Sequence, residues 1–211
     1  PLCHSERSEE STAPAGAPTT AGAPTTAGAF TSVATDTLPS LSGAVAWGDY
    51  DNDGDRDLAL SGYGADAGYI TAIYRNDVSG QARTFTVAVT DTFAALNSSA
   101  VAWGDYDNDS DLDLLLTGWD ADRVPHALVY RNEGGGTFAE AVTDTLPGLY
   151  YGDAAWGDYD QDGDLDILVS GARGRDVSPQ DPLVAVYRND GAGAFTAAIT
   201  DTLTDVYASA V

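Results

Sequence analysis

Short apolar runs and polar breaks alternate along most of this chain, from residue 30 to the end. Val, Ile, Leu, Tyr and Thr dominate the runs, and groups of Gly, Asp, Asn and Ser separate them. Runs of this length and composition predict β-strands, and the polar groups between them predict turns. No segment carries a helical period or a capping box, so the pattern predicts an all-β fold. The first four predicted strands cover residues 44–50, 58–62, 69–76 and 85–91.

Three sequence markers show that this pattern repeats about every 55 residues. Trp-Gly-Asp begins at residues 47, 103 and 156, and Tyr-Arg-Asn begins at residues 74, 130 and 187. Thr-Asp-Thr begins at residues 35, 90, 143 and 200. A shared period of this size is typical of propellers and solenoids.

Several predicted strands are apolar on both faces, for example residues 167–169 and 184–187. Such strands fit a sheet that neighbouring sheets cover on both sides, as in the blades of a propeller. We therefore expect a partial β-propeller of three complete four-stranded blades with a flanking strand at each end. The expected blades cover residues 42–92, 98–145 and 151–202, and the flanking strands lie near residues 30–36 and 207–211.

Residues 1–29 differ from the rest of the chain. The stretch 15–29 reads AGAPTTAGAPTTAGA and has no hydrophobic period. This composition predicts a disordered linker rich in Ala, Gly, Pro and Thr. No signal peptide is visible after Pro1, and we expect the sequence to be an internal piece of a longer protein.

The charge of the chain restricts its partners. The formal net charge is −24, and 15 of the 33 acidic residues lie in three aspartate clusters. A surface this negative argues against nucleic acid and against anionic membranes, which both need basic residues. No apolar run approaches the roughly 18 residues that would insert into a bilayer. Cys3 is the single cysteine, so disulfides cannot hold the fold.

The aspartate clusters are the strongest chemical signal. They read WGDYDNDGDRDL, WGDYDNDSDLDL and WGDYDQDGDLDI, with five aspartates within nine residues in each. So many neighbouring carboxylates repel one another unless a cation neutralises them. Ca²⁺ accepts six to eight oxygen ligands in flexible geometry, which predicts about three Ca²⁺ sites. The expected side-chain ligands are Asp49, Asp51, Asp53, Asp57, Asp105, Asp107, Asp109, Asp113, Asp158, Asp160, Asp162 and Asp166, and the expected carbonyl ligands are Asp55, Asp111 and Asp164.

Two details refine this metal hypothesis. An EF-hand is excluded because position twelve of each loop is Leu or Val inside a predicted strand, where an EF-hand needs Glu. Gly54 and Gly163 are expected at positive φ, whereas Ser110 takes that place in the second loop, so we expect the second site to be the weakest. The alternative is that the three loops are solvated hairpin tips without an ion.

These residues resemble the FG-GAP repeats of integrin α-subunits and of bacterial proteins with VCBS-type repeats. The WGDYDxDxDLDLxLxG cores and the YRNxGxGxF tails carry the resemblance over residues 30–211. The resemblance implies a β-propeller with calcium in the loop joining the first two strands of each blade. It also implies an extracellular or cell-surface setting and a role in adhesion or ligand binding. Such propellers usually have about seven blades, so further blades would come from the full-length chain or from self-association.

Candidate ligand-binding residues lie in loops that differ between the repeats. Variable loops on a rigid scaffold commonly determine specificity, although each residue alone can be an ordinary exposed one. The candidates at the end opposite the acidic loops are Tyr63, Trp119, Arg173, Tyr150 and Tyr151. The repeated Trp47, Trp103 and Trp156 are instead expected in the core.

The sequence offers no convincing catalytic constellation. His126 is the only histidine of the repeats, so neither a zinc site nor a Ser-His-Asp triad can be built. We expect a non-catalytic, calcium-binding extracellular module that binds a protein or glycan. The alternative is an accessory propeller of a larger secreted carbohydrate-active hydrolase or lyase.

Overall fold

The computed structural model describes residues 38–79, 82–142, 145–174, 181–191 and 194–200. All of them belong to the unit Val33–Val211. The expected linker at residues 1–29 and the expected flanking strands at residues 30–36 and 207–211 lie outside the described residues. No helix among the described residues is long and apolar enough to cross a membrane.

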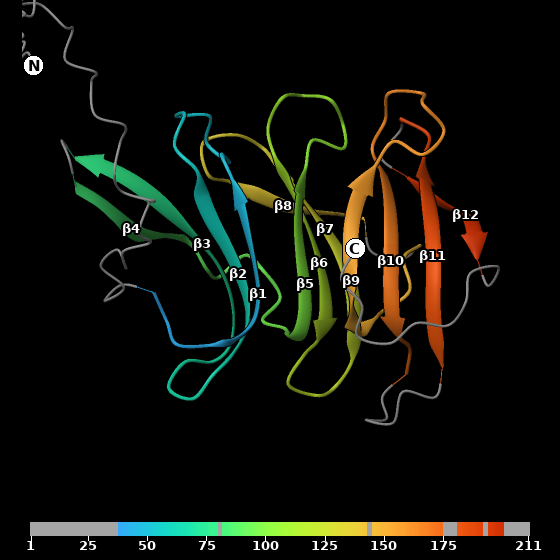
Figure 1. Ribbon diagram of the computed structural model, residues 1–211, viewed down its shortest axis with the longest axis horizontal. Coiled ribbons are helices and arrows are strands. Elements are labelled where there is room, and N and C mark those ends of the chain that lie inside the picture. Colours follow the sequence, from blue (N-terminus) through green and yellow to red (C-terminus); the bar gives the residue numbers. More distant parts are fainter. Residues whose placement is uncertain (1–37, 80–81, 143–144, 175–180, 192–193, 201–211) are drawn as a thin grey trace, which may run out of the picture. The chain divides into compact units, whose positions relative to one another are not determined.

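The described part of the chain is all-β and consists of three four-stranded antiparallel sheets (Figure 1). In each sheet the strands are ordered as they occur in the sequence, so every connection within a sheet is a hairpin. The strands are β1 (Ser42–Gly48), β2 (Asp57–Gly64), β3 (Gly68–Ser79), β4 (Ala82–Val89), β5 (Asn97–Gly104), β6 (Asp113–Trp119), β7 (Pro125–Asn132), β8 (Phe138–Val142), β9 (Tyr150–Gly157), β10 (Asp166–Ala172), β11 (Pro182–Asn189) and β12 (Phe195–Thr200). The expected partial, propeller-like arrangement of three four-stranded blades is confirmed.

The three sheets share one register. Trp47 pairs with Leu58 in the first sheet, and Trp103 pairs with Leu114 in the second. Trp156 pairs with Ile167 in the third. Because a shift of one residue would turn every side chain to the opposite face, this identity places equivalent residues on equivalent faces of each sheet.

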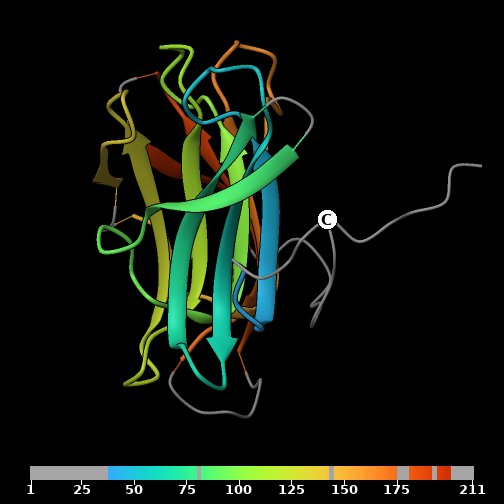
Figure 2. The same cartoon turned by 90° about the vertical axis from the view of Figure 1, so that its left-hand side faces the viewer.

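Neighbouring sheets pack face to face, with β5 lying between β1 and β9 (Figures 1 and 2). Strand β6 shows how the middle sheet serves both interfaces, because all of its residues are buried. Leu114 and Leu116 join the apolar cluster shared with the first sheet, whereas Leu115 joins the cluster shared with the third. The alternation of a strand thus sends successive leucines to opposite faces, each burial contributing about 1.5–3 kcal/mol.

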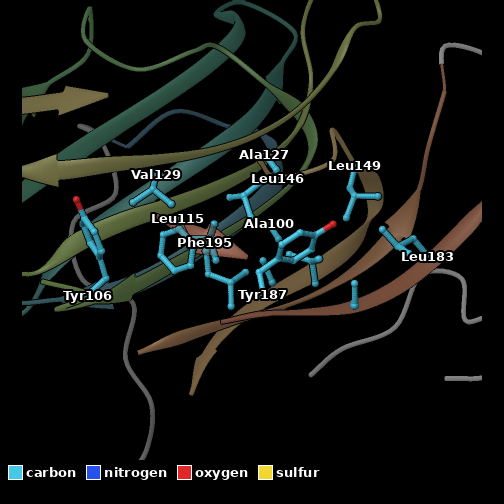
Figure 3. Packing of buried hydrophobic residues seen from close by; sticks show 14 residues of the cluster. Ala100, Tyr106, Leu115, Ala127, Val129, Leu146, Leu149, Leu183, Tyr187 and Phe195 are labelled. Carbon is cyan, nitrogen blue, oxygen red and sulfur yellow. The ribbon is translucent and has the colours of Figure 1, made fainter. Parts of the chain in front are cut away.

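The cluster between the second and third sheets is shown in Figure 3. Leu115 and Val129 of the middle sheet belong to the same cluster as Tyr187 and Phe195 of the third sheet. Leu149, which precedes β9, closes this cluster from the connection between the two sheets. The facing apolar sides of the first and second sheets, and of the second and third, are therefore completed by the next repeat along the chain.

The repeated tryptophans follow the sequence expectation only in part. Trp103 and Trp156 are partly buried and pack against the clusters between sheets. Trp47 has the same sequence context but is exposed, so placing it in the core was wrong. The difference arises because no described sheet lies against the outer face of β1.

Candidate metal centre

The three acidic loops connect the first and second strands of each sheet and lie at the same end of the three sheets, uppermost in Figure 1. They span residues 49–56, 105–112 and 158–165. Since the loops follow equivalent strands in the same register, each presents its aspartates in the same order. The geometry of one loop therefore informs the other two.

Each loop turns through two residues with positive φ. Gly54 has φ 91° and Gly163 has φ 98°, which confirms the expectation from the sequence. Ser110 has φ 77°, so the second loop keeps the same turn with a residue that is strained there. The second residue with positive φ lies two positions earlier in each loop. It is Asn52, Asn108 or Gln161, with φ of 58°, 60° and 64°.

The first aspartate of each loop folds the loop back on itself. Asp49 Oδ2 accepts a hydrogen bond from the backbone N–H of Gly54 at 3.1 Å. In the second loop Asp105 accepts from the N–H groups of Asp109 and Ser110, each at 3.0 Å. Asp158 makes the two equivalent bonds in the third loop. These carboxylates are thereby held facing the interior of their loops.

The last aspartate of each loop is buried and joins two strands. Asp57 accepts the N–H of Tyr50 at 3.2 Å through one oxygen and the N–H of Asn76 at 2.9 Å through the other. Asp113 and Asp166 make the same pair of bonds in their sheets. The bond to the third strand was missed by the sequence analysis, because its donor is a backbone N–H, which the residue type does not reveal.

The structure brings three carboxylates together in each loop, with one oxygen of each within 4.8 Å of the others. The groups are Asp49, Asp51 and Asp53 in the first loop, Asp105, Asp107 and Asp113 in the second, and Asp158, Asp160 and Asp166 in the third. Among the described residues, Asp49 Oδ1, Asp51 Oδ1 and Asp107 Oδ1 are buried and accept no hydrogen bond. A buried anionic oxygen without a partner is costly, so these atoms fit a cation ligand set.

The remaining predicted ligands are placed differently. Asp57 lies outside the first group of three, and Asp109 and Asp162 lie outside the second and third. Asp109 and Asp162 instead accept the N–H of the residue two positions later. The side chains of Asp55, Asp111 and Asp164, which were expected to bind only through their carbonyls, pair with Arg83, Asn52 and Asn108.

Burial and mutual repulsion raise the pKa of several of these carboxyls. Burial is the main cause for Asp57, whose pKa rises to about 6, and for Asp113, whose pKa rises to about 7. The pKa of Asp51 and that of Asp107 are also raised, first by burial and then by the charge of the next aspartate. The backbone N–H groups oppose the rise without cancelling it, so the loops carry uncompensated negative charge.

The loops of adjacent sheets are linked directly. The side-chain amide of Asn52 donates to Asp111 Oδ1 at 2.7 Å, and that of Asn108 donates to Asp164 Oδ1 at 2.8 Å. Each amide also lies 3.4 Å from a backbone carbonyl of the neighbouring loop. The asparagine in the middle of the first and second loops was the available signal, but its partner lies a whole repeat away. The acidic loops therefore form one connected row.

The candidate ligand-binding residues lie near the opposite end of the sheets, where the structure brings together only three of the five. Trp119 and Tyr150 are buried and stack with ring centroids 4.6 Å apart. Tyr151 is exposed and lies 5.1 Å from Trp119. Tyr63 is exposed beside Tyr69, and Arg173 pairs with Asp181. Tyr63 and Tyr151 are thus the aromatic candidates that present surface to a ligand.

Replacing Ser110 by Gly should stabilise the protein by about 1 kcal/mol, because glycine adopts the positive φ of this position without strain. Urea unfolding in excess EGTA measures this change without a contribution from metal. Gly54→Ala is the matched control and should lose a similar amount, since an added Cβ at Gly54 has no atom within 4 Å and only the backbone is strained. A Ser110→Gly variant no more stable than the parent would contradict this assignment.

Comparison with known proteins agrees with the repeat architecture. A family model described as FG-GAP-like repeat matches residues 49–116 and 120–169, which together are more than half of the chain. A search of curated proteins returned no match. The matched residues include all three acidic loops, and the second matched segment continues into β10. The chain therefore belongs to the FG-GAP-like repeat family and forms a module of the β-propeller type.

Proposed function

We propose that this chain is a calcium-binding, non-catalytic module that acts outside the cell and binds a protein or glycan ligand, as in adhesion. The observation that carries the calcium part is the convergence of three carboxylates in each acidic loop, together with buried carboxylate oxygens that lack hydrogen-bond partners in the first and second loops. The three groups contain only oxygen donors, which favours a hard cation. Calcium is preferred over magnesium because the loops offer many carboxylates in a flexible turn and no rigid octahedron.

The ions have a structural role in this proposal. Each ion offsets the repulsion among the aspartates of one loop. The first and second loops in turn contact the loop of the next sheet through Asn52 and Asn108. A ligand that binds only the folded state adds about 2.7 kcal/mol at a hundredfold excess over its dissociation constant. Extracellular calcium modules bind in the range of about 10⁻⁴–10⁻³ M, which suits the proposed location.

Calcium should raise the melting temperature of the protein, and EGTA should lower it. Differential scanning calorimetry in each condition measures the change, with magnesium at the same concentration as the control for nonspecific screening. The Asp107→Asn variant should lose part of the calcium effect, because it removes one unpaired carboxylate from the second loop. An unchanged melting temperature in excess calcium and in excess EGTA would refute the calcium proposal.

Calcium binding should also release protons near neutral pH. The pKa of Asp113 is about 7 and that of Asp57 about 6, so both carboxyls are partly protonated there and must ionise beside the ion. For the same reason these two groups stabilise the ion-free fold at low pH, and that contribution is lost as pH rises from about 4 towards 7.

Calorimetric titrations in buffers of different ionisation enthalpy measure the released protons. The release should be marked at about pH 6, where a large fraction of both carboxyls is protonated before the ion binds, and absent at about pH 9, where both are already ionised. Asp113→Asn should reduce the release, whereas Asp120→Asn, at the other end of the sheets, should leave it unchanged. Equal release at both pH values would show that the raised pKa values do not belong to the metal loops.

The proposed ligand surface lies at the end away from the acidic loops. It is supported by the sequence differences between the repeats there and by the exposed rings of Tyr63 and Tyr151. Arg123 lies over the ring of Trp119, 5.7 Å from its centroid, and adds a cation beside the aromatic group. Rigid aromatic side chains with a nearby arginine are the residues that most often dominate binding energy.

Arrays of glycans and matrix proteins should show binding without chemical turnover. Tyr63→Ala should weaken binding of the identified ligand about tenfold, a typical effect of removing an aromatic anchor. Val87→Ala, which shortens an exposed apolar side chain on β4, is the control and should bind normally. Cleavage of an arrayed glycan would replace this proposal with the accessory module of a carbohydrate-active enzyme.

A further inference from the structure

A hollow of about 400 Å³ lies where the first strands of the three sheets begin, at the end away from the acidic loops. Figure 1 shows these strands in one row, with β5 between β1 and β9. The walls of the hollow are Ser42 and Gly43 of β1, residues 97–99 of β5, and Tyr151 and Gly152 of β9. Its volume lies in the range of about 300–1,000 Å³ that small-molecule sites occupy. Each of the three sheets supplies one wall, so a further repeat at either end of the row would leave these walls in place.

Two of the three strands carry a β-bulge at the hollow. Residues 98–99 of β5 and residues 151–152 of β9 each lie opposite a single residue of the next strand, whereas β1 pairs with β2 without interruption. The bulges hold Ser98 at φ 49° and Tyr151 at φ 54°, where a residue with a Cβ is strained. Bulges are common beside active sites, where they re-aim a side chain. Glycine would relieve the strain, so its absence points to a use for the side chains of Ser98 and Tyr151.

The polar groups around the hollow can both donate and accept hydrogen bonds. Asn97 Oδ1 accepts the backbone N–H of Ser98 at 2.7 Å, so the NH₂ group of Asn97 is the part left to donate to a ligand. Ser99 Oγ donates to the carbonyl of Ser61 at 2.9 Å, so its lone pairs are left to accept. The hydroxyls of Ser42 and Ser98 can each do either. The hollow therefore offers a mixed set of donors and acceptors.

Tyr151 adds an aromatic wall that is fixed in place. It is 43% exposed, and its ring lies 5.1 Å from that of Trp119 and 5.2 Å from that of Tyr150. Trp119 and Tyr150 are themselves buried and stacked on each other. A tyrosine supported in this way provides a large contact area at a low cost in conformational entropy, and nearby Ser, Gly and Asn residues provide adaptable hydrogen bonds.

None of the residues that line the hollow carries a charge, in a chain with 33 acidic residues. A cationic ligand would find no carboxylate among these residues, and the net charge of −24 repels an anionic ligand. An apolar side chain of a protein would leave the amide and hydroxyl groups of the walls without partners, which is costly once water is excluded. A neutral ligand rich in hydroxyl groups avoids all three difficulties.

We propose that the hollow binds one neutral sugar residue of a glycan. The apolar face of the sugar ring packs on Tyr151, and its hydroxyl groups bond to Asn97 and to the serines of β1 and β5. Each sugar hydroxyl both donates and accepts, which matches the mixed donors and acceptors of the walls. The inference rests on the proposed ligand-binding function, for which it names the site and the chemical class of the ligand.

Saturation-transfer NMR and calorimetry on the whole chain in calcium test the proposal. The probes are methyl glycosides of neutral hexoses and N-acetylhexosamines, with the methyl glycoside of glucuronic acid as the anionic counterpart. At least one neutral glycoside should bind, and the glucuronide should not. Tyr151→Ala should raise the dissociation constant about tenfold or more, as expected for an aromatic anchor, with a normal circular dichroism spectrum because Tyr151 is exposed. Val87→Ala, on the exposed surface of β4, is the control and should bind like the parent.

Substitutions at Ser98 separate the effect of strain from that of recognition. Ser98→Gly removes both the hydroxyl and the strained Cβ, so it should raise the melting temperature while it weakens binding about three- to tenfold. Ser98→Ala removes the hydroxyl and keeps the strain. It should weaken binding equally without raising the melting temperature.

The outcomes distinguish this inference from the proposed function on which it rests. Binding of an arrayed matrix protein without binding of any neutral glycoside would overturn the inference and leave the ligand-binding function standing. If neither class of ligand bound, both would fail. A neutral glycoside that bound the Tyr151→Ala and Ser98→Gly variants as tightly as the parent would place the sugar site elsewhere and overturn the inference as well.

Discussion

The structure depends on one buried carboxylate in each sheet. It belongs to Asp57 in the first sheet, Asp113 in the second and Asp166 in the third. Each accepts one N–H from the acidic loop and one from the third strand, so it joins the loop to the sheet behind it. Burying such a group is costly unless hydrogen bonds and positive charge compensate it. The backbone provides the hydrogen bonds but little charge, and the raised pKa of Asp57 and Asp113 reflects that deficit. A dication is the simplest source of the missing charge.

This carboxylate also couples the acidic loops to the packing of the sheets. The asparagine whose N–H it accepts uses its own side chain to reach the preceding sheet, as Asn132 does with Tyr50. The order of contacts is therefore loop, buried aspartate, third strand and neighbouring sheet. A change in charge at one loop acts on an interface through three hydrogen bonds. The repeats are consequently not independent units, even though each has its own hairpins and its own acidic loop.

Local features of the fold were readable from the sequence, and contacts between repeats were not. Strand positions and the turns at Gly54 and Gly163 follow from residues close in sequence, because alternation and positive φ are local properties. The partners of Asn52 and Asn108 lie in the next repeat, and no local pattern identifies them. The same reason explains Trp47 and Trp103, which share a sequence context but differ in exposure. Trp119 and Tyr150 likewise are buried by a stacking contact between two sheets.

The distribution of charge favours separation of the three sheets at one end. Apolar contacts such as those of Leu115 and Phe195 hold the sheets together over their faces, whereas the acidic loops crowd negative charge at one end. Repulsion between loops would spread the sheets at that end. It would thereby weaken the contacts that the indoles of Trp103 and Trp156 make with Gly48 and Gly104, because these two glycines directly precede the first aspartate of their loops. Neutralising the loops would remove this repulsion, so that the amides of Asn52 and Asn108 would hold adjacent loops together through their hydrogen bonds to Asp111 and Asp164. Ion binding and sheet packing would then favour the same arrangement, and each would strengthen the other by linkage.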